Sequence, residues 1–265
     1  MTTNNHHKTI DTKNVIIKIF LVTAYFGMVV VNFLANSLPL NNRTTGEISN
    51  AYPNLFAPAG YTFAIWGLIY LLLAAFVLYQ FTPAGRKRRV LFSRVNLLFV
   101  VASVANSSWI FAWHFDCIGL SVIIMGVLLF SLIRIADILR DAQLTLQEKL
   151  FVYTPFGVYF GWVTVAAIAN VTVFLVSIGW NGFGLADAVW TMIILLVGAV
   201  VGILRMMKDK NIIYGLVLIW AYVGILMKHV SANGFGGQYS GVIAAVIVCL
   251  ALFGFIVIRM IVKMK

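Results

Sequence analysis

Charged residues are scarce in this chain, and acidic residues are the scarcest. Of its 265 residues, 10% are charged and 62% are hydrophobic, with 8 Asp or Glu against 19 Lys or Arg. Soluble domains average about a quarter charged residues, and a water-soluble fold of this size would need far more polar surface than this chain has. The composition therefore excludes an ordinary soluble protein and predicts an integral membrane protein.

Cysteine and the usual catalytic motifs are also nearly absent. The two cysteines, Cys117 and Cys249, form neither a Cys-x-x-Cys pair nor a metal-ligand spacing, and we interpret both as buried thiols. The chain has no Ser-His-Asp order, no His-Glu-x-x-His motif and no pair of carboxylates deep in an apolar run. The sequence thus predicts no catalytic residue and no metal site, and an enzyme is the less favoured class.

Long apolar runs are abundant. A helix needs about 20 mainly apolar residues to cross the ~30 Å hydrocarbon core of a bilayer. Eight segments meet this requirement: 15–36, 61–82, 95–114, 118–138, 151–175, 185–206, 212–229 and 239–262. The sequence therefore predicts an all-α protein with eight transmembrane helices, with both termini on the same side of the membrane.

The basic residues show which side that is. With the N-terminus in the cytoplasm, 17 of the 19 Lys and Arg residues lie on the cytoplasmic side, and only Arg43 and Lys228 lie outside. This asymmetry follows the positive-inside rule. The net charge of +11 is therefore an orientation signal and no indication of nucleic acid, and the GRKRR cluster at 85–89 is interpreted as an anchor to anionic lipid. We expect a multi-pass protein of a bacterial cell membrane with cytoplasmic termini.

Two polar segments flank the first predicted span. Residues 1–14 are expected to be a disordered cytoplasmic tail. The outside segment 37–60 is the longest connection, and Pro39, Pro53 and Pro58 prevent it from continuing as a helix. Because it also carries aromatic residues, we expect this segment to fold over a site in the bundle.

Charged residues inside the predicted spans are few. Arg134 and Asp137 lie three residues apart near the end of the fourth span, where an intrahelical ion pair is expected. His114, Asp116 and Asp187 lie at span ends and are expected to reach the interface. Because an ion-coupled pump would need charged groups deep in the membrane, the sequence disfavours that class.

Aromatic and amide residues, by contrast, recur on one face of three predicted helices. These faces carry Trp66 and Tyr70; Asn106, Trp109 and Trp113; and Tyr159, Trp162, Ala166 and Asn170. An amide in the membrane must find hydrogen-bond partners, so the faces are expected to point inward. Two interpretations stay open: the amides bond neighbouring helices while the aromatic side chains fill space, or the faces surround a ligand.

These segments resemble the TspO/MBR family of tryptophan-rich sensory proteins. PAGYTFAIWGLIY at 58–70 is similar to the proline-led stretch that leads into the second helix of the family. ANSSWIFAW at 105–113 and VYFGWVTVAAIAN at 158–170 are similar to motifs of its third and fifth helices. The resemblance covers roughly residues 14–178. The chain departs from the family pattern in lacking a proline between Phe63 and Trp66, in having Val158 where proline is usual and Trp113 where phenylalanine is usual, and in having three further helices.

The resemblance implies a TspO-like five-helix bundle over 15–178, followed by a three-helix extension over 179–265. Members of the family bind porphyrins, sterols and aromatic drugs in a pocket that the first outside loop closes. By similarity, the ligand-binding residues are Pro58, Phe63, Trp66, Tyr70, Asn106, Trp109, Trp113, Tyr159, Trp162, Ala166 and Asn170. No cofactor is required, and a porphyrin, a haem-like molecule or a sterol-like molecule is the expected ligand. A homodimer and contacts with membrane lipid are further expectations.

Three other functions stay open. The first is a secondary transporter or permease for a small organic solute, which should show polar groups at the membrane midplane. The second is an enzyme that acts on a bound pigment. The third is a purely structural role, which predicts a closely packed bundle without a pocket.

Overall fold

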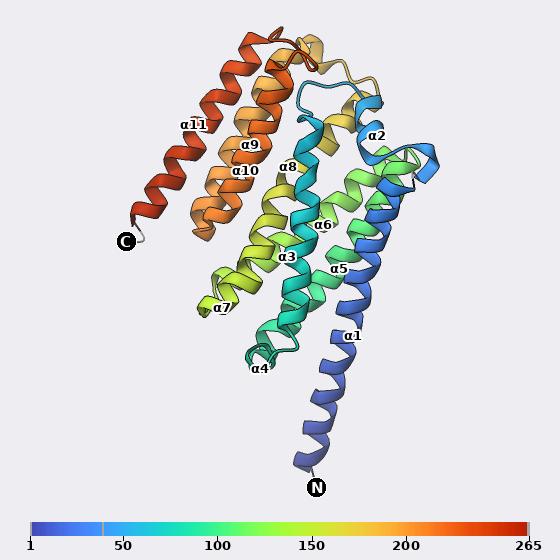
Figure 1. Ribbon diagram of the computed structural model, residues 1–265, viewed down its shortest axis with the longest axis vertical. Coiled ribbons are helices and arrows are strands. Elements are labelled where there is room, and N and C mark those ends of the chain that lie inside the picture. The colour runs from blue at the N-terminus through green and yellow to red at the C-terminus, as the bar shows by residue number, and fades with distance from the viewer. Residues whose placement is uncertain (1, 39, 264–265) are drawn as a thin grey trace.

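The computed structural model describes the backbone of residues 2–38 and 40–263 and the side chains of 15–38 and 40–263. Throughout those residues the regular elements are helical, and eight helices are long and apolar enough to cross a membrane. The long helices are α1 (Thr2–Ser37), α3 (Ile65–Tyr79), α5 (Arg89–His114), α6 (Ile118–Arg140), α8 (Thr154–Ser177), α9 (Asp187–Asp209), α10 (Ile212–Val230) and α11 (Ser240–Lys263) (Figure 1). The chain is thus an all-α, multi-pass membrane protein, as the sequence predicted.

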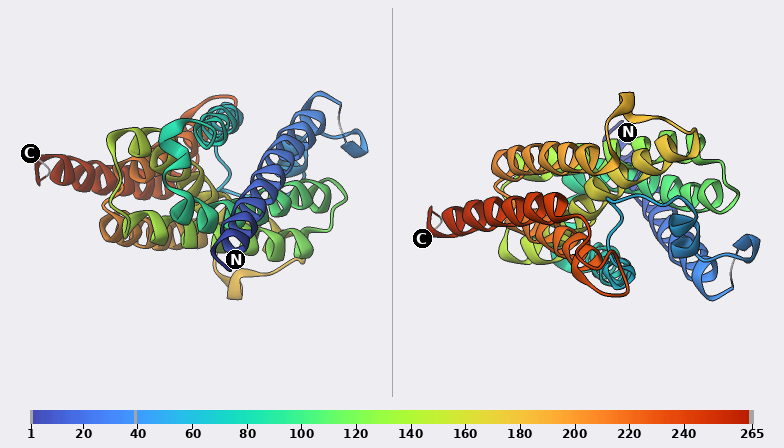
Figure 2. Two further views of the ribbon diagram at one scale, coloured as in Figure 1. Left: turned by 90° about the horizontal axis from the view of Figure 1, so that it is seen from below. Right: turned by 90° about the horizontal axis from the view of Figure 1, so that it is seen from above.

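The first five long helices form a closed bundle. Going around it, α1 packs on α3, α3 on α8, α8 on α6, α6 on α5, and α5 returns to α1. The last three helices attach mainly through α10, which packs on α8 and also contacts α9 and α11; α9 adds contacts with α6 and α8. The two end views in Figure 2 place this second group on the side of the bundle opposite α1.

Glycines bring α10 close to its neighbours. A Cβ atom added to Gly161 of α8 would lie 3.0 Å from the backbone oxygen of Tyr214, and one added to Gly202 of α9 would lie 2.5 Å from Cδ1 of Leu218. Gly157 and Gly198, four residues earlier on each helix, also face α10. Close packing at these two small-xxx-small pairs is what their spacing predicted.

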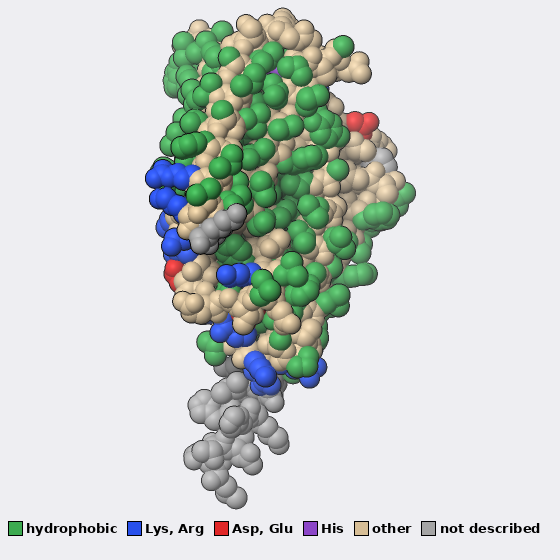
Figure 3. All heavy atoms as spheres, turned by 60° about the vertical axis from the view of Figure 1, so that its left-hand side comes forward, with side chains coloured by type: hydrophobic (Ala, Val, Ile, Leu, Met, Phe, Trp, Pro, Cys, Tyr) green, Lys and Arg blue, Asp and Glu red, His purple; other side chains and the backbone are tan. Residues whose placement is uncertain are grey.

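Short elements connect the long helices at two ends. One end, here called the lid end after the segment 40–60 (the lid segment, or lid), carries η1 (Leu40–Asn42), α2 (Thr45–Ala51) and η2 (Gly60–Ala64), with η4 (Gly182–Gly184) between α8 and α9. The opposite end, here called the basic end, carries α4 (Pro83–Arg86), α7 (Leu146–Glu148) and the π-helical turn η3 (Lys149–Tyr153). Figure 3 shows Lys and Arg side chains gathered toward the basic end, below a surface that is mostly hydrophobic.

Two sequence-based expectations, at opposite ends of the fold, are wrong. The helix α1 begins at Thr2, so the backbone of the polar segment expected to be disordered continues the first helix. Cys249 is buried as expected, but Cys117 is exposed because it lies in the short turn between α5 and α6.

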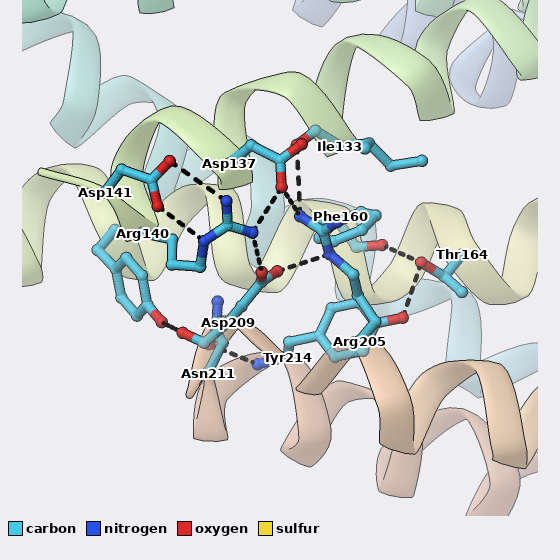
Figure 4. Close-up of polar contacts among 11 residues, drawn as sticks. Ile133, Asp137, Arg140, Asp141, Phe160, Thr164, Arg205, Asp209, Asn211 and Tyr214 are labelled. Atoms are coloured by element: carbon cyan, nitrogen blue, oxygen red, sulfur yellow. Dashed lines mark hydrogen bonds and ion pairs between the residues drawn. The ribbon is translucent and has the colours of Figure 1, made fainter. Parts of the chain in front are cut away.

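A network of four charged side chains joins α6 to α9 at the basic end (Figure 4). Asp137 of α6 accepts from Arg140 at 2.8 Å and from Arg205 of α9 at 2.9 Å. Asp209, whose side chain is 2% exposed, accepts from Arg205 at 2.7 Å and from Arg140 at 3.3 Å. The expected pairing of Asp137 with Arg134 is therefore replaced by pairs that link the five-helix bundle to the last three helices.

Candidate ligand-binding site

Two adjoining hollows lie among α1, α3, α5 and α8, beneath the segment 40–60. The larger has a volume of about 380 Å³ and the smaller about 60 Å³. Both are lined by Thr45, Phe63, Trp66 and Trp109, and we call them the two lobes of one cavity. The bundle therefore contains a cavity at the lid end, where a purely structural role predicts none.

Aromatic side chains from three helices form the walls of this cavity. Trp66 stacks on Tyr70, with ring centroids 5.7 Å apart, and meets Trp162 edge-on at 6.2 Å. On the α5 side, Trp109 stacks on Trp113 at 5.2 Å. Stacked and edge-to-face pairs at these distances are attractive, so the walls hold one another in place.

The two asparagines of the aromatic faces bond neighbouring helices. Asn170 of α8 accepts from the indole N–H of Trp109 at 2.8 Å and donates to Ser121 of α6 at 2.8 Å. Asn106 of α5 accepts from Asn32 of α1 at 2.6 Å and donates to the hydroxyl of Tyr159 at 3.1 Å. Of the two interpretations left open, bonding between helices is the one observed for the amides.

Two other polar atoms of the walls have no protein partner. The indole N–H of Trp162 and the hydroxyl of Tyr70 are buried, and neither forms a hydrogen bond within the described part of the chain. Buried polar groups are normally satisfied, and an exception calls for an explanation. Trp162 lines the smaller lobe and Tyr70 the larger, so both unpartnered groups belong to side chains of the cavity wall.

One side of the lid segment is fastened to the end of α5. His114 is fully buried, and its two ring nitrogens lie 3.1 Å from the backbone oxygen of Leu40 and 3.1 Å from Oγ1 of Thr45. The indole N–H of Trp113 donates to the backbone oxygen of Thr45 at 3.2 Å. His114 is therefore buried beneath the lid, whereas the sequence placed it at the interface. Asp116 does lie at the surface, where it pairs with Arg43.

The other side of the lid segment is fastened to α10, one of the last three helices. His229 donates from Nε2 to the backbone oxygen of Leu55 at 2.9 Å, and Ala59 donates its backbone N–H to Gly224 at 2.9 Å. Just after the lid, the indole N–H of Trp220 donates to the backbone oxygen of Thr62 at 3.1 Å. The last three helices thus help to hold the cover of the cavity.

The structure brings together most of the residues expected to bind a ligand. Nine line the cavity: Pro58, Phe63, Trp66, Tyr70, Trp109, Trp113, Trp162, Ala166 and Asn170. Asn106 and Tyr159 do not line it; the amide of Asn106 donates to the hydroxyl of Tyr159 instead. The ligand role of all eleven stays a prediction.

Sequence reasoning missed the polar lining that α1 and the lid contribute. Asn32 and Asn36 of α1 line the larger lobe, and Ser49 and Asn54 of the lid line the smaller. The i, i+4 spacing of the two α1 asparagines is a signal that would have placed them on one inward face. The lid contacts of α10 had no comparable signal, because they join residues more than 150 positions apart.

Comparison with known proteins gives one match that covers most of the chain. A family model described as TSPO-like protein matches residues 18–261. This match includes α9, α10 and α11, for which the sequence motifs had suggested no counterpart. Searches among curated proteins and among solved structures gave no match.

Proposed function

Because the chain belongs to the TSPO-like protein family, we propose that its cavity binds a flat hydrophobic ligand. The family supports a membrane sensor or binding protein in general. Our proposal is more specific: the ligand is a porphyrin, another tetrapyrrole or a sterol-like molecule, and the protein acts as its receptor, sensor or carrier. The division of the chain at residue 178 and a homodimer stay predictions.

The observation that carries the proposal is the aromatic cavity beneath the lid segment. Its larger lobe, at about 380 Å³, falls in the range of about 300–1,000 Å³ typical of small-molecule sites. Each stacked pair between an aromatic side chain and a planar ligand contributes about 0.5–1.5 kcal/mol beyond the burial of area. The unpartnered indole N–H of Trp162 adds one donor that can orient a carboxylate or ring nitrogen of the ligand.

Titration of the purified protein with protoporphyrin, followed by the ligand's absorbance band, tests the proposal. We expect saturable binding at one site, and loss of affinity by at least tenfold in the double variant Trp66→Ala with Trp162→Ala. Trp180→Ala is the matched control, because Trp180 packs against Trp190 and Phe183 near η4, away from the cavity lining. Absence of saturable binding, or equal loss in the control, would reject the proposal.

The alternative proposal is a transporter or permease for a small organic solute. The observation in its favour is the polar side of the larger lobe, which Asn32 and Asn36 line, although these residues lie toward the lid end and not at the midplane, where such a site is expected. Solute uptake into proteoliposomes separates the two proposals, since a receptor binds its ligand without net movement across the bilayer.

The position of the basic residues supports an orientation. We propose that the basic end faces the cytoplasm of a bacterial cell, with the lid outside. Figure 3 shows the Lys and Arg side chains concentrated toward that end, as the positive-inside rule requires. Cysteine labelling by a membrane-impermeant reagent from either side would test it.

A further inference from the structure

A separate hollow of about 270 Å³ lies at the basic end, where α1, α4 and α5 meet. It shares no lining residue with the cavity beneath the lid. Three basic side chains line it, Lys18 of α1, Arg86 of α4 and Arg89 of α5, and none of the described lining residues is acidic. A hollow with this charge attracts an anion.

Two buried amide side chains in the wall of this hollow each have one atom without a hydrogen-bond partner. Gln80 is 1% exposed and Asn96 is 3% exposed, and both line the hollow. The amide nitrogen of Asn96 lies 3.4 Å from Oε1 of Gln80, which leaves Nε2 of Gln80 and Oδ1 of Asn96 without a hydrogen bond. Buried polar groups are normally hydrogen-bonded, so these two call for an explanation. A molecule in this hollow that offers an acceptor to Gln80 and a donor to Asn96 would satisfy both groups.

The position of Lys18 is fixed by its surroundings. Its ammonium group donates to the backbone oxygen of Gln80 at 2.9 Å and lies 5.3 Å from the centre of the Phe81 ring. Apolar side chains lie beside it at the edge of the hollow, with Val15 57% and Phe81 44% exposed. The hollow therefore combines fixed positive charge with an apolar edge in the part of the molecule expected at the membrane surface.

We propose that this hollow binds a phosphate ester that also carries a hydroxyl group, as the phosphoglycerol headgroup of an anionic lipid does. The phosphate oxygens accept from the basic side chains and from Nε2 of Gln80, and the hydroxyl donates to Oδ1 of Asn96. The same chemistry is offered by a lipid headgroup and by a soluble phosphate ester. The exposed apolar edge would receive the acyl chains of the lipid.

Native mass spectrometry of the full-length protein in neutral detergent tests this site. The probes are phosphatidylglycerol, phosphatidylcholine as the zwitterionic comparison, and soluble glycerol phosphate as competitor. We expect bound phosphatidylglycerol, with an affinity that falls on the order of tenfold or more in Lys18→Gln with Arg86→Gln. The matched control is Lys87→Gln with Arg94→Gln, which removes the same charge from exposed positions that do not line the hollow.

A second variant tests the amides without changing charge. Gln80→Leu with Asn96→Leu removes both unpartnered groups together, so the fold should keep its thermal stability while affinity for phosphatidylglycerol falls. Displacement of the lipid by glycerol phosphate would assign the site to soluble esters, and retention of the lipid would assign it to headgroups; either result supports the proposal. Equal loss in the two charge variants, or no preference for phosphatidylglycerol over phosphatidylcholine, overturns it.

Discussion

Trp109 on α5 donates its indole N–H to the side-chain oxygen of Asn170 on α8, with 2.8 Å between the two atoms. This bond joins two walls of the cavity across the bundle, and both residues line its smaller lobe. It therefore fixes an aromatic ring at the site in addition to linking two helices.

Replacing Asn170 by Leu should lower the thermal stability of the protein and loosen the Trp109 side chain. Hydrogen bonds between transmembrane helices are worth about 0.6 kcal/mol on average and up to about 1.7 kcal/mol. Asn170→Leu leaves the indole N–H of Trp109 without its acceptor, while the hydroxyl of Ser121 keeps its bond to the backbone oxygen of Ile118, so we expect a loss of about 1–2 kcal/mol. A double-mutant cycle with Trp109→Phe, which keeps an aromatic ring but removes the N–H, measures the interaction free energy between the two side chains. Additive losses would show that the bond contributes nothing.

The stability that the charge network between α6 and α9 contributes should depend on its buried carboxylate, Asp209. Asp209→Asn removes a carboxylate that pairs with two arginines and is 2% exposed, which leaves Asp137 as the one carboxylate that Arg140 and Arg205 share. We expect a loss of about 3–5 kcal/mol in the free energy of unfolding. Asp141→Asn is the matched control, because that carboxylate also pairs with Arg140 but is 70% exposed, and its loss should be below about 1 kcal/mol. Equal effects would mean that burial at Asp209 is unimportant.

The fastening of the lid to α10 can be tested at one glycine. A Cβ atom at Gly224 would lie 2.2 Å from Oγ1 of Thr62, so Gly224→Ala must push η2 away from α10. We expect a loss of about 1–3 kcal/mol and faster hydrogen exchange in residues 52–62.

Gly254→Ala on α11 is the control for this change, since no atom lies within 4 Å of its added Cβ. That variant should leave both stability and exchange near the wild-type values. Unchanged exchange at the lid in Gly224→Ala would show that packing against α10 does not hold the lid, and would contradict the role of α10 as its anchor.

The stability of the first turn of α2 should depend on pH. Thr44 and Glu47 form a capping box, in which the Glu47 carboxylate accepts from the backbone N–H and the hydroxyl of Thr44. These hydrogen bonds hold the pKa of Glu47 below its usual value. The group therefore stabilises α2 above its ordinary pKa, and this contribution is lost as the pH falls through the lowered pKa.

Hydrogen exchange of α2, corrected for the intrinsic effect of pH, measures this change. Opening of α2 should increase on acidification, and Glu47→Gln should make it nearly independent of pH over the same range. An unchanged pH profile in that variant would assign the effect to another group.

The sequence predicted the spans and the aromatic faces well, because both follow from local spacing. A run of about 20 apolar residues specifies a helix that crosses the membrane, and residues such as Trp162 and Ala166 fall on one face through helical periodicity alone. The family match over 18–261 confirms the resemblance that those motifs suggested.

The sequence did not predict the features that depend on contacts between distant segments of the chain. The pairing of Asp137 with Arg205 joins residues 68 positions apart, so the local spacing to Arg134 gave the wrong partner. The same holds for His114, whose burial depends on how residues 40–45 fold over it. The sequence left bonding between helices as one of two interpretations for Asn106 and Asn170, and only the placement of their neighbours identified the partners.

The most direct test of the account is the binding of protoporphyrin to Ala166→Phe. Ala166 lines the smaller lobe of the cavity, so a phenyl group there would occupy space that the ligand needs. Ala244→Phe places the same side chain at an exposed position on α11. Affinity measured side by side should fall by tenfold or more in Ala166→Phe and stay at the wild-type value in Ala244→Phe. Equal affinity in all three proteins would contradict the claim that this cavity holds the ligand.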